Sequence, residues 1–229
     1  MNISSMMRRI GITAIIFVAS AAATLTITPQ HATAAPTRNP ILFVHGWLGA
    51  AWNWQSMVSR FEAAGYSSAE LRAFSYDITQ SNELIAEEVK AEADALRGAT
   101  GASKIDIVSH SMGGLNSRWY LKFLDGTRYV DDWVSIGGPN HGTEIAYGCF
   151  DVSCEEMRPG SGLLADLNSG DETPGGVTYG TWWSPCDEII NPDQSVLLNG
   201  AANTKTGCLG HVALLGDATV FAQVRDFVA

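Results

Sequence analysis

A serine, an acid and a histidine occur in this chain in an order that could support acyl transfer. Ser111 lies in the run Ser-His-Ser-Met-Gly-Gly over 109–114, directly after an apolar, β-branched segment and before a segment with helical spacing. A sharp strand–turn–helix connection lifts a serine hydroxyl clear of the sheet and exposes it as a nucleophile. The usual pattern, G-x-S-x-G, has glycine where this chain has Ser109. Serine is also small, so we expect the turn to tolerate it.

A serine nucleophile near pH 7 needs a histidine base, and the histidine needs a carboxylate that fixes its tautomer. In chains with this turn the order along the sequence is serine, acid, histidine. His211 follows the candidate acids and precedes the last helical segment, so we predict that it is the base. Asp187 is the preferred acid because it follows an expected strand, and sites in open parallel sheets form at the carboxyl ends of strands. Glu188 and Asp193 are the alternatives.

Two backbone N–H groups must stabilise the negative charge that develops on an attacked carbonyl oxygen. We predict that one belongs to Met112, directly after the serine. The other is expected from Trp47, with Leu48 as the alternative, in the glycine-rich loop after the first apolar run. Gly46 permits a close backbone path there. We expect His45 and Gly46 at the substrate-binding site, with His45 also holding this loop through hydrogen bonds.

The N-terminal residues are typical of a secretory signal peptide. A pair of arginines precedes an apolar stretch over 10–23, and small residues follow as far as Ala35. We predict cleavage after Ala34 or Ala35, with a signal peptide over 1–34 and a single domain over 36–229. A membrane anchor is the alternative, but the apolar stretch is short for a span of about 20 residues.

The charge of the chain narrows the classes of partner. The 229 residues include 14 basic and 24 acidic side chains, a net charge of −10 that becomes more negative once the two leader arginines are removed. A strongly acidic surface argues against binding to nucleic acid or to anionic membranes.

Four cysteines, Cys149, Cys154, Cys186 and Cys208, follow the leader. An even number of cysteines in an exported chain implies disulfides, and three pairings are possible. We expect Cys149–Cys154, which closes a tight loop, and Cys186–Cys208, which would tie the loop of the acid to the loop of the histidine. Zinc ligation is the rival interpretation, but none of the spacings resembles a zinc site. We therefore predict no metal and no organic cofactor.

Strand and helix patterns alternate along the chain, which predicts a parallel sheet covered on both faces. We expect strands over 40–44, 71–76, 104–109, 133–136 and 177–183, and helices over 52–64, 82–96, 115–124 and 219–228. Gly65 is expected to end the first helix and Asn82 to cap the second. Residues 138–186 are rich in glycine and show little periodicity outside that last strand, which is typical of functional segments.

Together these features resemble the small secreted bacterial lipases of class 2, in the α/β-hydrolase superfamily. The matching segments are Phe43–Trp47, Ser109–Gly114, Gly137–Thr143, Ser184–Asp187 and Gly210–Val212. The resemblance implies a small α/β-hydrolase fold with a mostly parallel sheet and helices on both faces. It also implies cleavage of acylglycerols or other carboxylic esters through an acyl-enzyme on Ser111. Asp187 and His211 would complete the triad, with Trp47 and Met112 as oxyanion donors.

The resemblance further implies a secreted, extracellular monomer that takes a lipid or other ester substrate, makes transient contact with a lipid interface and needs no cofactor. A polyester or cutin hydrolase and an acyltransferase are alternatives on the same triad. A binding protein on an inactive hydrolase fold is less consistent with the sequence, because all three triad candidates are present. The minimal family members lack a lid, and this chain differs from them in its longer stretch between Gly142 and Cys186.

Overall fold

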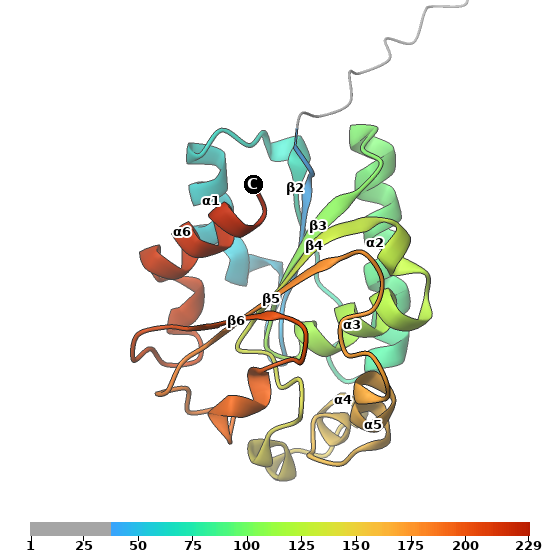
Figure 1. Ribbon diagram of the computed structural model, residues 1–229, viewed down its shortest axis with the longest axis vertical. Helices are drawn as coiled ribbons and strands as arrows, with labels where there is room; N and C mark the ends of the chain where they lie inside the picture. Colours follow the sequence, from blue (N-terminus) through green and yellow to red (C-terminus); the bar gives the residue numbers. More distant parts are fainter. Residues whose placement is uncertain (1–37) are drawn as a thin grey trace, which may run out of the picture. The chain divides into compact units, whose positions relative to one another are not determined.

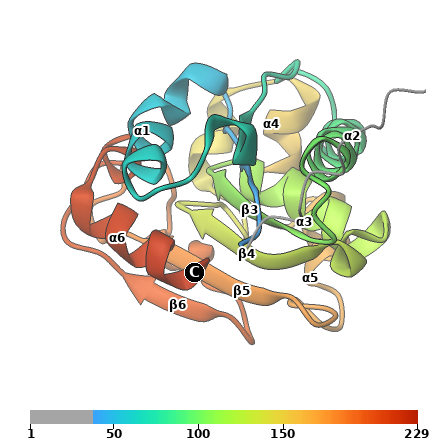
Figure 2. The same cartoon turned by 90° about the horizontal axis from the view of Figure 1, so that it is seen from above.

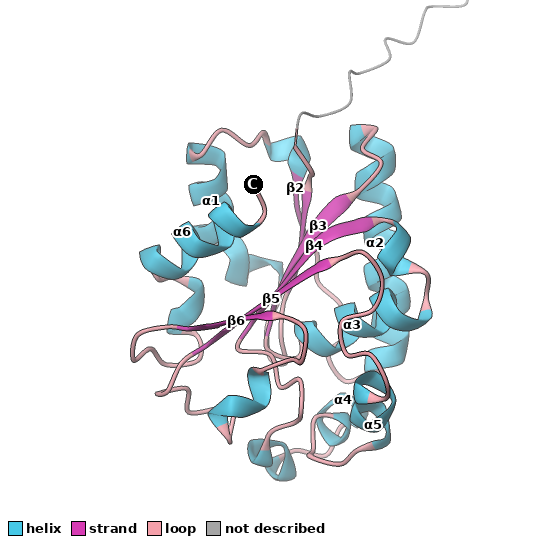
Figure 3. Cartoon of the chain, in the orientation of Figure 1, coloured by secondary structure: helices cyan, strands magenta, loops and turns pink. Residues whose placement is uncertain are grey.

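A computed structural model describes residues 38–229, so the predicted signal peptide lies outside the described residues. The strands are β1 (Ile41–Val44), β2 (Leu71–Ala73), β3 (Ile105–His110), β4 (Val130–Ile136), β5 (Thr178–Trp183) and β6 (Ala202–Lys205). All neighbouring strands are parallel, in the order β2-β1-β3-β4-β5-β6 (Figures 1 and 3). The predicted parallel α/β sheet is confirmed.

Helices cover both faces of this sheet. One face carries α1 (Gln55–Ala63) and α6 (Ala218–Phe227), and the other carries α2 (Asn82–Thr100) and α3 (Gly113–Phe123), as Figures 1 and 2 show. Two short helices, α4 (Val152–Glu156) and α5 (Gly162–Asn168), follow β4 and lie near α3. Within residues 38–229, no helix is both long and apolar enough to cross a membrane.

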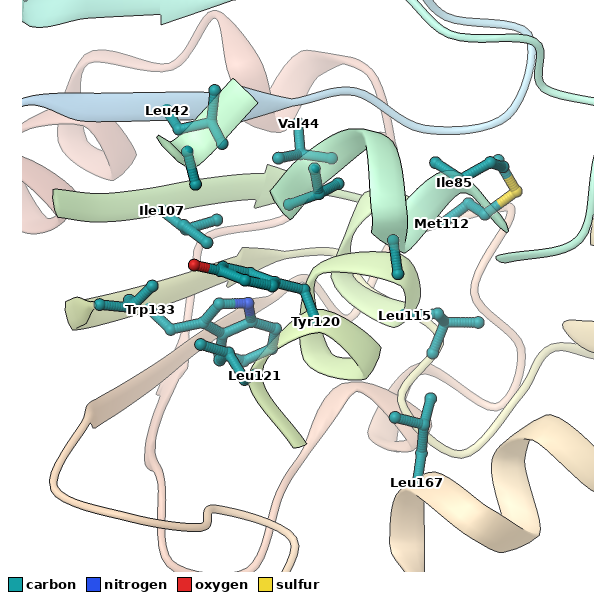
Figure 4. Close-up of a cluster of buried hydrophobic side chains, with 14 of the residues drawn as sticks. Leu42, Val44, Ile85, Ile107, Met112, Leu115, Tyr120, Leu121, Trp133 and Leu167 are labelled. Atoms are coloured by element: carbon teal, nitrogen blue, oxygen red, sulfur yellow. The ribbon is translucent and has the colours of Figure 1, made fainter. Parts of the chain in front are cut away.

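Alternate residues of the central strands supply two separate cores, because successive side chains of a strand point to opposite faces. In β1, Leu42 and Val44 join the core under α2 and α3, whereas Ile41 and Phe43 join the core under α1 and α6. Figure 4 shows the first core, to which β3 and α3 also contribute. Met112 belongs to it and is fully buried, so the residue after the candidate nucleophile anchors the turn in the core.

The start of α2 differs from the prediction. Ser81, and not Asn82, caps the helix, because its Oγ accepts a hydrogen bond from the Leu84 N–H at 3.3 Å. The Asn82 side chain is buried and donates to Glu156 at 2.9 Å and to the Ser153 carbonyl at 3.3 Å. Asn82 therefore links α2 to α4 rather than satisfying the end of its own helix.

Several other elements also depart from the sequence pattern. β2 stops at Ala73, three residues before the predicted end, and α2 continues to Thr100. β6, α4 and α5 were not predicted. Each is seven residues or shorter, so hydrophobic periodicity has little length over which to develop.

Candidate active site

Ser111 occupies a strained turn between β3 and α3. Its φ of 54° lies in the left-handed region, which costs free energy for a residue with a side chain. Its N–H donates to the Ile136 carbonyl at 3.0 Å, which ties the turn to the end of β4. Gly113 lies so close to the backbone of Val44 and His45 that any Cβ would collide with it. Contacts from two neighbouring strand ends therefore hold the serine in place.

Ser109 stands where glycine is usual, and the turn accommodates it through a specific contact. Its side chain is completely buried, and its Oγ donates to the Val134 carbonyl of β4 at 2.7 Å. A buried hydroxyl without a partner would be unfavourable, so this hydrogen bond explains why serine is compatible with the site.

Asp187 and His211 form a buried pair, with 2.8 Å between Asp187 Oδ2 and His211 Nδ1. The other carboxylate oxygen of Asp187 accepts hydrogen bonds from the N–H groups of Ile189 at 2.9 Å and Ile190 at 3.0 Å. Burial alone would raise the pKa of Asp187, but the His211 interaction and the two backbone donors outweigh it, and the pKa lies below its ordinary value. An ionised carboxylate only accepts hydrogen bonds. The proton of the neutral ring therefore lies on Nδ1, and Nε2 is free to act as a base.

The loops that carry this pair are tied together. The predicted disulfide pairing is confirmed, and Cys186 and Cys208 lie with their Cα atoms 5.0 Å apart. Ser184 reinforces the tie, since its Oγ accepts from the Leu209 N–H at 2.9 Å and donates to the Leu209 carbonyl at 2.6 Å. The acid and the histidine are therefore held by a covalent link and by hydrogen bonds.

His110 and Gly137 shape the surroundings of His211. The His110 ring lies 4.5 Å from the His211 ring, and its Nε2 is 3.2 Å from the His211 carbonyl. Burial lowers the pKa of His110 to about 3, so it is neutral and can donate Nε2–H to that carbonyl. A Cβ on Gly137 would lie 3.2 Å from both Asp187 Oδ2 and His211 Cε1. The absence of a side chain at Gly137 lets the pair approach the end of β4.

The loop after β1 passes directly beside Ser111. A Cβ on Gly46 would lie 2.5 Å from the Ser111 Cβ, so only glycine fits there. Within residues 38–229, the backbone N–H groups of Trp47 and Met112 donate to no other protein group. The Met112 N–H also lies at the N-terminus of α3, where the helix dipole favours negative charge. Both predicted oxyanion donors are therefore available.

The side chain of His45 does not reach the substrate side, contrary to the expectation of a substrate contact. It is 1% exposed, and its ring stacks on Tyr76 with 3.9 Å between the ring centroids. Its Nδ1 lies 2.9 Å from the Gly46 carbonyl, and burial lowers its pKa. The Tyr76 hydroxyl also donates to the His45 carbonyl. The contacts agree with its other expected role, that of holding the loop.

A cavity of about 450 Å³ opens beside Ser111 and His211. Most of its wall is apolar, and much of that wall comes from the segment between β4 and β5. The lining residues include Trp47, Leu48, Trp52, Ile145, Cys149, Cys154 and Val212. Ser111 therefore faces a space suited to an apolar group.

The alternative acids lie elsewhere. Glu188 Oε2 accepts a hydrogen bond from the His211 backbone N–H at 3.0 Å, and among the described residues its carboxylate makes no hydrogen bond with the His211 ring. Asp193 begins a short 3-10 helix, Asp193–Val196. Of the three candidates, the structure brings Asp187 to the imidazole. No group of three or more His, Cys, Asp and Glu side chains in the described part of the chain could hold a metal ion.

Sequence reasoning did not assign roles to Gly137, Thr143 or Asp151. Thr143 Oγ1 donates to the Ile189 carbonyl and accepts from the Asn191 N–H at 3.1 Å, so it supports the loop of Asp187. The glycine pair at 137–138, directly after an expected strand, was the available signal for a close approach. The contacts of Thr143, and the hydrogen bond from the Trp47 indole to Asp151, join distant segments and leave no local pattern.

The sequence of the chain is also similar to a known protein family. Residues 38–204 match the family model described as "Lipase (class 2)". A triacylglycerol lipase of Pseudarthrobacter phenanthrenivorans is 30% identical over 122 residues, which cover 50% of this chain and 37% of that protein. One from Burkholderia plantarii is 30% identical over 122 residues and 33% of its length. The chain thus spans about a third of the length of these relatives.

Solved structures show the same fold at low sequence identity. The mature form of a Bacillus licheniformis lipase has a TM-score of 0.74 and 17% identity, with coverage of 88% of this chain and 96% of that chain. Aspergillus fumigatus lipase B has a TM-score of 0.68 and 18% identity, with coverage of 82% and 52%. At these identities the likeness is one of fold.

Proposed function

The chain belongs to the class 2 lipase family, and on this basis we propose that it is a secreted serine carboxylic-ester hydrolase. The observation that carries the proposal is the buried Asp187–His211 pair, at 2.8 Å, whose histidine lines the same cavity as Ser111 on its strained turn. A nucleophile, a base and an orienting carboxylate are the groups that acyl transfer through serine requires.

The reaction proceeds in two halves. His211 Nε2 takes the Ser111 proton while Oγ attacks the ester carbonyl carbon, and the resulting oxyanion accepts hydrogen bonds from the N–H groups of Trp47 and Met112. The imidazolium, stabilised by Asp187, then protonates the departing alkoxide, and the alcohol leaves an acyl-enzyme on Ser111. Water, deprotonated by His211, attacks that acyl group. Collapse of the second intermediate releases the carboxylic acid and returns the proton to Ser111.

The proposed substrate has an apolar acyl chain and no net negative charge. The apolar wall beside Ser111 stabilises hydrocarbon by removing it from water, whereas the charge of −10 over the whole sequence disfavours anionic substrates. Exposed apolar side chains also surround the cavity and the segment that walls it, namely Leu48, Trp52, Ile145, Tyr147, Phe150, Val152 and Val212. Transient contact of this rim with a neutral lipid interface is part of the proposal.

Hydrolysis of p-nitrophenyl butyrate by wild type and Ser111→Ala tests this function. We expect the variant to lose activity by at least about 10³-fold while keeping its circular dichroism spectrum and thermal midpoint. A fluorescent alkyl phosphonate should label wild type on Ser111 and should not label the variant. Full activity or labelling in Ser111→Ala would reject the assignment. A folded wild-type protein that neither cleaves esters nor reacts with the phosphonate would reject the function.

A further inference from the structure

Trp47 is joined to the segment that walls the cavity by a hydrogen bond from its side chain. Its indole Nε1–H donates to Asp151 Oδ2 at 3.2 Å, across 104 residues of sequence. Because the backbone N–H of Trp47 is one of the two proposed oxyanion donors, this contact connects the loop over 46–49, here called the oxyanion loop, to the segment between β4 and β5. Both side chains are partly buried, which shields the bond from competing water.

Asp151 is itself held firmly in the disulfide-closed loop Cys149–Cys154. Its second oxygen, Oδ1, accepts from the Cys154 N–H at 3.0 Å and from the Ser153 hydroxyl at 2.7 Å, so Asp151 caps α4. The two carboxylate oxygens therefore have separate partners. One fixes the helix, and the other is directed at Trp47.

α4 is fixed to the rest of the protein on its far side. Glu156 Oε2 accepts from the Asn82 backbone N–H at 2.6 Å and from its side chain at 2.9 Å. The Ser153 hydroxyl also lies against the Ile78 carbonyl, so its single proton is shared between this carbonyl and Asp151 Oδ1. These contacts anchor the segment to the start of α2, so Asp151 is presented to Trp47 from a fixed support.

The oxyanion loop needs such an anchor because its backbone is strained. Leu48, the residue after Trp47, has a φ of 56° although it is not a glycine, and its side chain is 68% exposed. Such a conformation persists only where surrounding contacts impose it. The Gly49 N–H closes the turn on the Gly46 carbonyl at 3.0 Å, but the Leu48 side chain adds little burial. The hydrogen bond between the Trp47 indole and the Asp151 carboxylate holds the turn from the segment between β4 and β5.

We propose that Asp151 is a positioning residue, which orients the Trp47 backbone N–H toward the oxyanion through the indole hydrogen bond. The proposal rests on the proposed function. In this arrangement the loop Cys149–Cys154 does more than wall the acyl site, since it sets the geometry of the oxyanion hole for every ester, whatever its acyl length.

Two substitutions break this bond from opposite sides. Asp151→Asn retains one oxygen that can cap α4, where asparagine is as good as aspartate, but it turns an NH₂ group toward the indole N–H. Trp47→Phe keeps one aromatic ring and the backbone N–H, and it removes the indole donor together with part of the ring surface that lines the cavity. Glu155→Gln is the matched control, because Glu155 is an exposed acid of the same helix whose partner is Arg158.

The experiment measures kcat and KM on p-nitrophenyl acetate and p-nitrophenyl octanoate, together with thermal midpoints. We expect each of the first two variants to lower kcat about tenfold on both esters, less than the 10²–10³-fold loss of a whole oxyanion donor. KM should change little in Asp151→Asn, because Asp151 is not among the residues that line the cavity and the acyl contacts remain, whereas Trp47→Phe also alters the cavity wall. The double variant should be no slower than the slower single one, since both remove one interaction. Glu155→Gln should match wild type.

The outcomes distinguish a positioning role of Asp151 from a role in shaping the wall of the acyl site. A loss confined to the octanoate ester, or seen only in KM, would show that Asp151 shapes the acyl site and would overturn the proposal. So would wild-type kcat in Trp47→Phe, or additive losses in the double variant. Failure of the proposed function is distinguishable, since wild type would then be inactive on both esters, whereas here wild type stays active and dependent on Ser111.

Discussion

Glu188 accepts a hydrogen bond from the backbone N–H of His211, with 3.0 Å between Oε2 and N. Its neighbour Asp187 binds the imidazole of the same histidine at 2.8 Å. The two consecutive acids thus have a division of roles, because Glu188 holds the backbone of His211 and Asp187 holds its ring. A Cβ on Gly210 would lie 3.0 Å from Glu188 Oε2, so the glycine before the histidine makes room for this contact.

This division predicts different effects of neutralising the two acids. Asp187→Asn should lower kcat on p-nitrophenyl butyrate by about 10³–10⁴-fold, because the amide can leave the imidazole in the wrong tautomer and cannot stabilise its charge. Glu188→Gln keeps an oxygen that can accept the His211 N–H, so we expect a change of less than about threefold. Steady-state kinetics on the purified pair checks this. If Glu188→Gln proved as damaging as Asp187→Asn, Glu188 would have to serve the ring as well.

The close passage of Gly46 beside Ser111 predicts that even one methyl group is harmful there. A Cβ at Gly46 lies 2.5 Å from the Ser111 Cβ, which forces the loop or the serine to move. We expect Gly46→Ala to reduce kcat/KM by about 100-fold or more, since displacements near 1 Å cost that much.

The matched control for Gly46→Ala lies in α2. A Cβ on Gly98 meets nothing within 4 Å, so Gly98→Ala should leave activity unchanged and stabilise the fold by about 0.5–1 kcal/mol. Esterase assays and urea unfolding of both variants test the pair. Normal activity in Gly46→Ala would mean that the loop can move away from the serine without cost.

Asp106, at the start of β3, predicts how stability depends on pH. Burial, and next the charge of Asp132, raise the pKa of Asp106 to about 8. Its Oδ1 accepts from Asn39 and from the Asp132 N–H, both at 3.1 Å, whereas its buried Oδ2 has no partner among the described residues. For a carboxyl whose folded pKa is raised, the stabilisation is complete below its ordinary pKa near 4 and is lost as pH rises through the folded value.

Asp106→Asn stays neutral, so its stability relative to wild type should improve between about pH 4 and pH 8 and then level off. Urea unfolding across this range measures the difference. Asp94→Asn, which removes an acid of α2 that is paired with Lys90 at 2.8 Å and is not among the charges acting on Asp106, controls for the loss of one carboxylate. A difference between Asp106→Asn and wild type that does not vary with pH would contradict a raised pKa for Asp106.

The local patterns in the sequence were sufficient to predict the alternation of strands and helices and the turn at Ser111. These features depend on neighbours a few residues apart, such as the apolar run before Ser111 and the glycines after it. The order of Ser111, Asp187 and His211 along the chain was sufficient to nominate the three residues together. The missed elements, β6, α4 and α5, are too short to show a period.

Only the tertiary structure decided which polar groups meet. Glu188 binds the backbone of His211 across 23 residues, His45 stacks on Tyr76 instead of facing the cavity, and Asp151 binds the indole of Trp47 across 104 residues. Hydrophobic periodicity predicts which face of a helix or strand is buried. It does not predict which residue of a distant loop will be the hydrogen-bonding partner. Such pairs form only when the strand ends and the segment between β4 and β5 come together in the folded protein.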